Sequence, residues 1–527
     1  MRLLNPLQKP PGYVLASILC SLGGFLFGID TGIIGPVTVM EDFTAYVGNP
    51  SPMIHGLIVS SILIPAAISS FFAGKVADVL GRPYGIAIGS LIFGAGAALE
   101  GASIHIAMFV VGRIVEGIGE GLYLSVLVVY ICEISPPRNR GALTTGPQLL
   151  ITLGLVTGFF TCYGTANIPS SFSWRLPFIL LATCSIVFSI SVLLWLPASP
   201  RWLTLHGRTK EASAAWEKLD VPAADREKII DQYDAPVVET AIPDASGDTG
   251  AAHVTSTTVA TPKPKKTQLL DVFSTEARPR LFLAVFLMGM QQLSGIDGVL
   301  YYAPLLFQQA GLSSNEATFL ASGVSAIVIF AVTIPAAILA DKWGRRANTI
   351  LGGLGMATTM FLMGSLYASN TVHASTGAGR WVVVVCIYLF AVIYALSWAV
   401  GIKIYAAEIQ PQRTRASATS IAHGGNWLSN FLVALVTPTL LARTSYGAYF
   451  LFGGCALLTA AVCFVFMPET RGLSLGEIDQ AFSHRGGQVS ALKEFAKGLR
   501  RRTHVHEGVP SSVELNVSLR RGVGQAV

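Results

Sequence analysis

The stretch YICEISPPRNR, from Tyr130 to Arg140, returns later in the chain as YAAEIQPQRTR, from Tyr405 to Arg415. The two copies agree, at equal spacing, in the tyrosine, the glutamate, the isoleucine, the first proline and both arginines. A second repeat pairs DVLGR at 78–82 with DKWGR at 341–345. Fixed motifs that recur once in each half of a chain indicate an internal duplication. The chain is therefore predicted to consist of two matching halves.

Each repeat lies beside apolar stretches that can cross a bilayer, which takes about 20 residues per helix. The 527 residues are 52% hydrophobic and only 13% charged, and the mean hydropathy is +0.57. This composition favours an all-α polytopic membrane protein, with twelve transmembrane helices in two pseudo-symmetric six-helix bundles. The twelve expected spans are Tyr13 to Val39, Ile54 to Ala73, Tyr84 to Ser103, Ala107 to Tyr130, Leu143 to Tyr163, Pro177 to Leu196, Leu281 to Phe307, Ala317 to Ala340, Thr349 to Ala368, Trp381 to Ile404, Ser417 to Leu441 and Tyr449 to Met467.

Four segments follow from this pattern: a bundle over 1–202, a cytosolic linker over 203–280, a second bundle over 281–480 and a cytosolic tail over 481–527. Within the linker, Glu211 to Tyr233 suits short surface helices, and Asp234 to Pro264 has the composition of a disordered segment. In the tail, the basic run from Lys493 to Arg502 either lies on the membrane surface or is disordered.

Lysine and arginine in the short loops set the orientation, because cytoplasmic loops carry the positive excess. One side of the predicted membrane collects most of them, and the other has only Arg175, Arg380 and Arg443. We therefore expect both termini in the cytosol. The basic side holds Lys75, Arg82, Arg138, Arg140, Lys342, Arg345, Arg346, Arg413 and Arg415.

Several ordered motifs carry a family resemblance. They are GKVADVLGRP (Gly74 to Pro83), PASPRWL (Pro197 to Leu203), QQLSGID (Gln291 to Asp297), YYAP (Tyr301 to Pro304), ADKWGRR (Ala340 to Arg346) and PETRG (Pro468 to Gly472). Over residues 13 to 480 the chain resembles the sugar porters of the major facilitator superfamily. The sequence of its motifs and linker is similar to that of fungal members. The resemblance implies secondary active transport of a sugar, polyol or related hydroxylated molecule by alternating access, coupled to protons. It implies a monomer in the plasma membrane that needs no cofactor.

Charged residues inside a membrane are costly and usually functional. Asp30 and Arg113 are predicted at similar depth in the outer half of their spans. The resemblance makes them the proton-coupling pair, although a static structural pair is the alternative. Glu116 and Glu120 share the helix face of Arg113 and are either its partners or additional proton carriers.

For the substrate, the resemblance points to amide side chains, which offer both donors and acceptors to a polyol. The matching positions are Gln148, Gln291, Gln292, Asn426 and Trp427, with Tyr301 and Tyr302 as the outer gate. Helix-packing contacts are the competing interpretation for each of them.

Three positions depart from the family pattern. Asp297 stands where an amide is usual, Ala198 stands where a glutamate is usual, and Lys403 replaces a tryptophan that stacks on the sugar. Lys403 and Asp297 are therefore added to the expected substrate site. Lys403 either forms a salt bridge with Asp297 or binds a carboxylated substrate.

At the cytosolic ends of the helices, acidic and arginine side chains form predicted latches between helices. The residues are Asp78, Arg82, Glu133, Arg140, Asp341, Arg345, Glu408 and Arg415, with Glu133 expected to pair with Arg140, Glu408 with Arg415 and Asp78 with Arg82. Charges that only set topology are the alternative.

Other functions were weighed against transport. An exporter of a secondary metabolite and a nutrient sensor that binds without transporting both remain open. An enzyme is not expected, because the sequence has no nucleophile with a base, no metal-ligand cluster and no phosphate-binding loop. The seven cysteines lie in or beside apolar spans without a CxxC pair, and no basic patch with interleaved aromatics indicates a nucleic-acid partner.

Overall fold

A computed structural model describes residues 10–48, 50–223, 226, 272–274, 277–312, 315–339, 343–372, 377–411, 414–471 and 482, with the side chains of 137, 138, 315–318, 415 and 416 left out. Residues 1–471 form one compact unit and residues 472–527 a second. The segment predicted to be disordered, the basic run of the tail and Asp341 lie outside the described residues.

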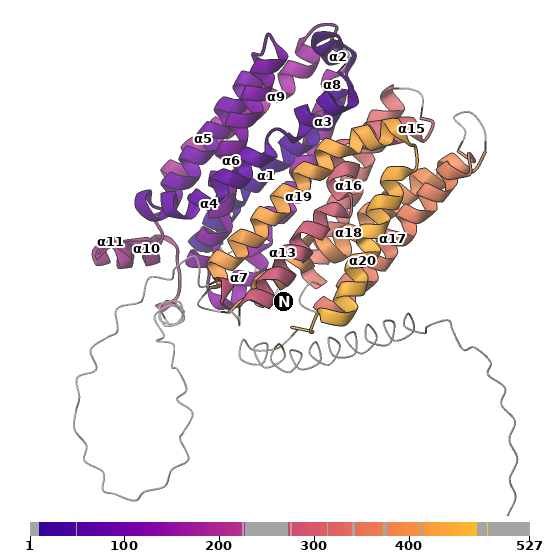
Figure 1. The fold of residues 1–527 in the computed structure, drawn as a ribbon. Coiled ribbons are helices and arrows are strands. Elements are labelled where there is room, and N and C mark those ends of the chain that lie inside the picture. The colour runs from indigo at the N-terminus through magenta and orange to yellow at the C-terminus, as the bar shows by residue number, and fades with distance from the viewer. Residues whose placement is uncertain are drawn as a thin grey trace, which may run out of the picture. The chain divides into compact units, whose positions relative to one another are not determined.

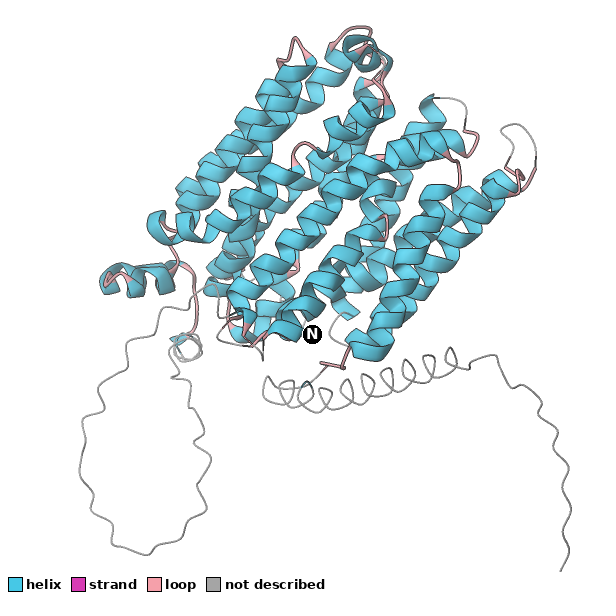
Figure 2. Cartoon of the chain, viewed as in Figure 1, coloured by secondary structure: helices cyan, strands magenta, loops and turns pink. Residues whose placement is uncertain are grey.

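Every regular element in the described ranges is a helix (Figure 2). In chain order they are α1 Gly12–Thr38, α2 Glu41–Val47, α3 Pro52–Ser60, α4 Leu63–Leu80, α5 Arg82–Gly101, α6 Ile106–Ile134, α7 Pro137–Thr144, α8 Gly146–Thr165, α9 Phe172–Trp195, α10 Pro200–Leu205, α11 Thr209–Lys218, α13 Arg278–Leu293, α14 Ile296–Tyr301, α15 Ala303–Gln309, α16 Asn315–Leu339, α17 Arg345–Ala368, α18 Gly379–Glu408, α19 Arg415–Arg443 and α20 Gly447–Phe466.

The described residues contain twelve stretches that are long and apolar enough to cross a membrane, and three of these stretches join two helices each: α3 with α4, α7 with α8 and α13 with α14. This confirms the predicted number of spans. Their outward faces carry large apolar side chains: Leu194 is 65% exposed and Phe464 is 66% exposed. Such faces are stable only against lipid. The chain is thus a multi-pass membrane protein.

The two halves repeat their helix pairings as well as their loop motifs. In the first half α1 packs on α8, α5 on α6 and α5 on α9. In the second half α13 packs on α19, α17 on α18 and α17 on α20. Figure 1 shows the halves side by side, the first in indigo to magenta and the second in red to yellow. The pseudo-symmetric six-helix bundles expected from the duplication are therefore present.

The seventh predicted span is not one continuous helix. It divides into α13, α14 and α15, with breaks at Ser294 and Gly295 and again at Tyr302. Gly295 has a φ of 89°, a left-handed conformation that glycine adopts without strain. Interrupted helices are a feature of transporter binding sites, because the freed backbone groups line a polar cavity.

The bundle has two distinguishable ends. We name the end where Arg82, Glu133, Arg345 and Glu408 lie the basic end, and the opposite end, which holds Tyr46 and Ser103, the far end. Toward the far end the halves meet backbone to backbone. A Cβ on Gly35 would overlap the carbonyl of Tyr301, and one on Gly56 would overlap that of Leu435. The halves are therefore closely packed there.

Candidate functional site

Arg113 of α6 is buried at the centre of the first half, and its Nη1 contacts two carboxyl groups. It donates to Oδ1 of Asp30 at 2.5 Å and to Oε2 of Glu116 at 3.1 Å, while Nη2 donates to the carbonyl of Val59 at 3.4 Å. The exposed fractions of Asp30 and Arg113 are 3% and 1%. The two residues predicted to form a pair are thus brought together, and Glu116 shares the same guanidinium.

A third carboxyl group near Arg113 was missed by the sequence analysis. Oε2 of Glu100, near the end of α5, lies 3.8 Å from Nη1 of Arg113, and the side chain is 0% exposed. Oε2 of Glu116 lies 3.1 Å from the same Nη1, so the two carboxyl groups share one nitrogen of Arg113. Glu100 is three residues from the predicted end of its span, so its sequence position resembles that of an interfacial residue. Only the packing of α5 on α6 reveals the neighbour.

Glycines allow that packing. Gly89 and Gly96 of α5 face Gly112 and Gly119 of α6, and each pair repeats on one face of its helix. A Cβ on Gly96 would overlap the backbone of Glu116, and one on Gly112 would lie 2.7 Å from Cγ of Glu100. The close approach of the two helices therefore sets Glu100 and Glu116 side by side.

Glu120 lies one turn farther along α6 and differs from its neighbours. It is 0% exposed, and neither carboxyl oxygen has a hydrogen-bond partner among the described residues. The hydroxyl of Tyr123, which is equally buried and unpartnered, is near enough to interact with it electrostatically. Glu120 is thus not a direct partner of Arg113, which was one of the two alternatives.

In the second half, the predicted amides form one hydrogen-bonded cluster at the break in the seventh span. Nε2 of Gln292 donates to Oδ1 of Asn426 at 3.1 Å, and Nδ2 of Asn426 donates to Oε1 of Gln291 at 3.2 Å. Nε2 of Gln291 also donates to the carbonyl of Trp398 at 2.7 Å. Within the described ranges, Oε1 of Gln292 is buried and has no hydrogen-bond partner, so an acceptor remains for a ligand hydroxyl.

Lys403 contacts the other half of the protein. Its Nζ, on α18, donates to Oε1 of Gln148 on α8 at 3.2 Å. Lys403 and Asp297 are both described, and the structure contains no ion pair between them within 4 Å. They remain close enough to interact electrostatically, as do Lys403 and His423. The predicted Lys403–Asp297 salt bridge is therefore replaced, in this conformation, by a bond to a neutral amide.

The predicted gate residues lie where the halves meet toward the far end. The hydroxyl of Tyr302 donates to the carbonyl of Ala434 at 2.6 Å, and its ring packs edge-on against His55 of the first half at 5.4 Å between centroids. Nδ2 of Asn430 donates to the hydroxyl of Tyr301 at 3.5 Å. The sequence analysis overlooked Asn430, although it follows Asn426 by one helical turn.

Trp427 also reaches across the interface. Its ring meets that of Phe27 of α1 edge-on, with centroids 6.2 Å apart. In such a contact the edge of one ring meets the face of the other, so Trp427 of the second half packs directly against α1 of the first.

At the basic end of the first half, Arg82 is the centre of the charged contacts. Its Nε and Nη2 hold both carboxylate oxygens of Glu133, at 3.1 and 3.0 Å, and its Nη1 lies 2.7 Å from Oδ1 of Asp78. Arg140 donates to the carbonyl of Ser135 at 3.4 Å. The two-pronged contact of Glu133 is therefore with Arg82, whereas the sequence analysis had expected Arg140.

The second half repeats this arrangement. Nη2 of Arg345 lies 3.4 Å from Oε1 of Glu408, whose other oxygen accepts from Thr470 at 2.8 Å. Glu469 of the PETRG motif accepts from the backbone N–H groups of Arg345 and Arg346, at 2.7 and 3.1 Å. A carboxylate there caps the first turn of α17. The side chain of Arg415 lies outside the described residues.

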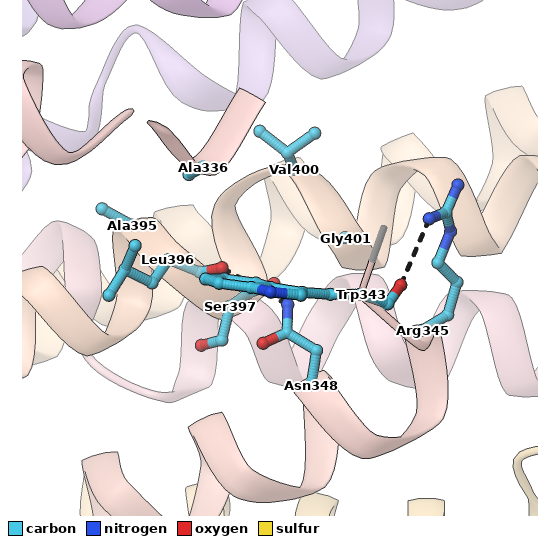
Figure 3. A pocket seen from close by; sticks show the side chains of 9 residues that line it. All are labelled: Ala336, Trp343, Arg345, Asn348, Ala395, Leu396, Ser397, Val400 and Gly401. Carbon is cyan, nitrogen blue, oxygen red and sulfur yellow. Dashed lines mark hydrogen bonds between the residues drawn. The ribbon is translucent and has the colours of Figure 1, made fainter. Parts of the chain in front are cut away.

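A hollow opens within the second half, away from the amide cluster (Figure 3). It is small and is lined by residues of α16, α17 and α18 together with Trp343. Figure 3 shows Asn348 beneath the ring of Trp343, and its Nδ2 donates to the carbonyls of Leu396 and Ser397 at 3.3 Å. This hollow holds none of the predicted substrate residues. No group of metal-ligating side chains with a suitable arrangement occurs in the part of the chain that the structure describes.

Comparison with known proteins agrees with this architecture. The family model "Sugar (and other) transporter" matches residues 16–482. The low-affinity glucose transporter HXT1 of Saccharomyces cerevisiae is 30% identical, over 91% of this chain and 85% of its own length. The sugar transport protein MST7 of Oryza sativa is 30% identical, over 88% of this chain and 90% of its own length.

Among solved structures, the xylose transporter XylE from E. coli in an inward open conformation has a TM-score of 0.70 and 24% identity, covering 89% of this chain and 99% of that one. The proton:xylose symporter XylE bound to 6-bromo-6-deoxy-D-glucose has a TM-score of 0.69 and 25% identity, with the same coverage. With twelve spans in two repeated bundles and a family match over most of its length, the chain belongs to the sugar transporter family, whose members are carriers and not enzymes.

Proposed function

We propose that this sugar carrier couples the movement of its substrate to that of a proton, and that Asp30 carries the proton. The observation that supports this is the contact between Asp30 of α1 and Arg113 of α6, both wholly buried in one half. A carboxylate held by a guanidinium inside a membrane is stable only as a pair, so a proton on Asp30 weakens the pair and changes how α1 packs on α6. One solved relative is described as a proton:xylose symporter.

The substrate binds, on this proposal, between the amide cluster and the ring of Trp427, with Asp297, Lys403 and Gln148 around it. Amides present donors and acceptors in fixed directions, as a polyol requires. Asp297 and Lys403 carry opposite charges, so together they add no net charge to the site. A neutral hexose, pentose or polyol is therefore the favoured substrate, with one hydroxyl donating to Asp297 and another accepting from Lys403.

A carboxylated sugar is a second candidate. In its favour, Nζ of Lys403 is within hydrogen-bonding distance of a neutral amide and not of a carboxylate. A substrate carboxylate would supply the missing anion. The variant Lys403→Trp separates the candidates, since it removes the cation and adds a stacking ring. Neutral hexoses should still be transported, per molecule of carrier at the surface, if they are the substrates, and transport of acidic sugars should be lost if they are.

We further propose that the basic end faces the cytosol, with both termini on that side, and that one chain in the plasma membrane is the working unit. The arginines at the basic end are arranged as the positive-inside rule requires, and each half contributes residues to a single central site. Tags at the two ends and protease protection in intact cells test the orientation. Digestion of either tag from outside would refute it.

The function is tested by uptake of labelled sugars, polyols and sugar acids in cells that lack their own sugar carriers. Asp30→Asn should abolish accumulation against a gradient but retain exchange of labelled for unlabelled substrate, because the proton site is lost while the amides remain. Asp42→Asn is the matched control, since that carboxylate of α2 accepts a bond from Ser173 at the far end. An Asp30→Asn protein that still accumulates substrate would exclude the coupling role. Export from preloaded vesicles without uptake would favour a metabolite exporter, and binding without flux would favour a sensor.

A further inference from the structure

More carboxyl groups surround Arg113 than one arginine can neutralise. Asp30, Glu100, Glu116 and Glu120 are between 0% and 3% exposed. If all were ionised, one positive and four negative charges would leave a net charge of minus three inside the membrane. Unpaired buried charges cost several kcal/mol each. Some of these carboxyl groups must therefore carry protons.

The contacts indicate which ones. Among the described residues, neither oxygen of Glu100 accepts a hydrogen bond, and its Oε2 shares Nη1 of Arg113 with Oε2 of Glu116, at 3.8 and 3.1 Å. Two buried carboxyl groups that share one cation resist ionising together, and a proton held by one can be donated to the other. Among the described residues, no group donates a hydrogen bond to either oxygen of Glu120, and no cation contacts it. Its carboxyl group is therefore protonated and neutral. The unpartnered hydroxyl of Tyr123 lies near Glu120.

We infer that Glu100 and Glu116 hold one proton between them and together carry the single negative charge that keeps Arg113 neutralised while Asp30 takes up and releases the coupling proton. The groups that face this site are Asp30 from α1, Glu100 from α5, Glu120 and Tyr123 from α6, and Tyr301 from α14. The inference rests on the proposed role of Asp30.

This arrangement changes how coupling operates. If Asp30 were the sole partner of Arg113, its protonation would leave a guanidinium stranded in the membrane. With Glu116 at 3.1 Å, the arginine stays paired in both protonation states of Asp30. The free-energy difference between the protonated and ionised forms of Asp30 is therefore smaller. Asp30 can then exchange its proton in each conformation of the transport cycle.

The shared proton makes a specific prediction about glutamine substitutions. In Glu100→Gln the amide imitates the protonated acid and donates to Glu116, so the negative charge remains. In Glu116→Gln the charge moves to Glu100, 3.8 Å from the guanidinium. Only the double variant removes the charge. Asp30 then holds Arg113 alone, and its carboxylate is harder to protonate.

The experiment is the initial rate of labelled-sugar uptake against external pH. The double variant Glu100→Gln, Glu116→Gln should move the profile to lower pH by about one unit. Each single variant should move it by less than half as much. Asp42→Asn on α2 is the control outside this site and should leave the profile in place, because that carboxylate accepts its bond from Ser173. Two singles that each equal the double, or a double that behaves as the parent, would overturn the inference.

A second measurement does not depend on coupling. Asp30→Asn alone keeps Arg113 paired with Glu116, so the amount of folded protein at the cell surface should remain within twofold of the parent. Asp30→Asn added to the double variant strands the arginine and should reduce the surface amount at least fivefold. If Asp30→Asn lowered the surface amount equally in the parent and in the double variant, Glu100 and Glu116 would not carry the charge that neutralises Arg113. If uptake by the parent is independent of pH, the proposed coupling fails, and the surface measurement still decides the inference.

Discussion

Lys403 of α18 donates a hydrogen bond to Gln148 of α8 at 3.2 Å and thereby joins the two halves of the carrier. Lys403 lies five residues before Glu408 at the basic end of α18, so the bond forms on that side of the amide cluster, about 7 Å in from the end of the helix. Toward the far end the halves meet through backbone contacts of Gly35 and Gly56. The conformation is thus held by a polar contact on one side and by close packing on the other.

The first prediction concerns this bond. Gln148→Glu turns it into an ion pair, which over-stabilises this conformation relative to the others in the transport cycle. The maximal uptake rate should fall about tenfold, equivalent to ~1.4 kcal/mol. In a Lys403→Met background the new glutamate has no cation to hold, and the added loss should disappear. Equal loss in both backgrounds would show that the bond does not restrain the halves.

The second prediction concerns Lys403 and Asp297. Either Lys403→Met or Asp297→Asn leaves the other charge uncompensated inside the protein, so each should lower surface amount and uptake. The double variant should recover part of the loss, with a coupling energy of about 1 kcal/mol. Surface labelling and uptake of the four proteins give the cycle. Strictly additive losses would show that the two charges act independently.

The third prediction tests the packing of α5 on α6. Gly96→Ala places a methyl group on the backbone of Glu116, and backbone cannot move aside cheaply. The cost should be about 1–3 kcal/mol, seen as a lower unfolding temperature in detergent. Gly74→Ala in α4 is the control, because a Cβ there meets nothing within 4 Å. A Gly96→Ala protein as stable as Gly74→Ala would mean that the helices can separate without penalty.

The fourth prediction concerns Glu469. Glu469→Ala removes the acceptor for two backbone N–H groups at the start of α17 and should destabilise the protein by about 1–2 kcal/mol. Glu469→Gln keeps an oxygen in place and should lose less than half of that. Thermal unfolding of the purified proteins measures both. Equal destabilisation of Glu469→Ala and Glu469→Gln would show that Glu469 does not cap α17.

The sequence predicted the large features well because they depend on composition and repetition. Twelve apolar stretches and two duplicated loops required two similar bundles, although which helices pack together was not predicted. The break at Gly295 was not expected, since the apolar pattern runs through it. A positive φ is a local backbone property that composition does not reveal.

The site was predicted in part. The residue types of the amide cluster and of Asp30 with Arg113 were identified from motifs, and the structure places each set together. Three features of the site were not identified: the role of Glu100, the partner of Lys403 and the partner of Glu133. Each depends on the rotation of one helix against its neighbour, which sequence patterns do not give. Charge alone favoured Asp297 for Lys403, whereas the reach of the side chain from α18 favours Gln148 on the opposite half.

The two kinds of chemistry assigned to this carrier lie in different halves. The groups that hold charge around Arg113 come from α1, α5 and α6, while the amide cluster, Asp297 and Lys403 come from α13, α14, α18 and α19. Mutations in the second half can therefore change which substrate is preferred without disturbing the charged groups of the first half. Mutations in the first half can change ion coupling without altering the substrate site of the second half. Duplication of an ancestral bundle gives each copy freedom to diverge on its own. Gln148 and Tyr301 cross this division, and we expect changes at either position to affect both properties together.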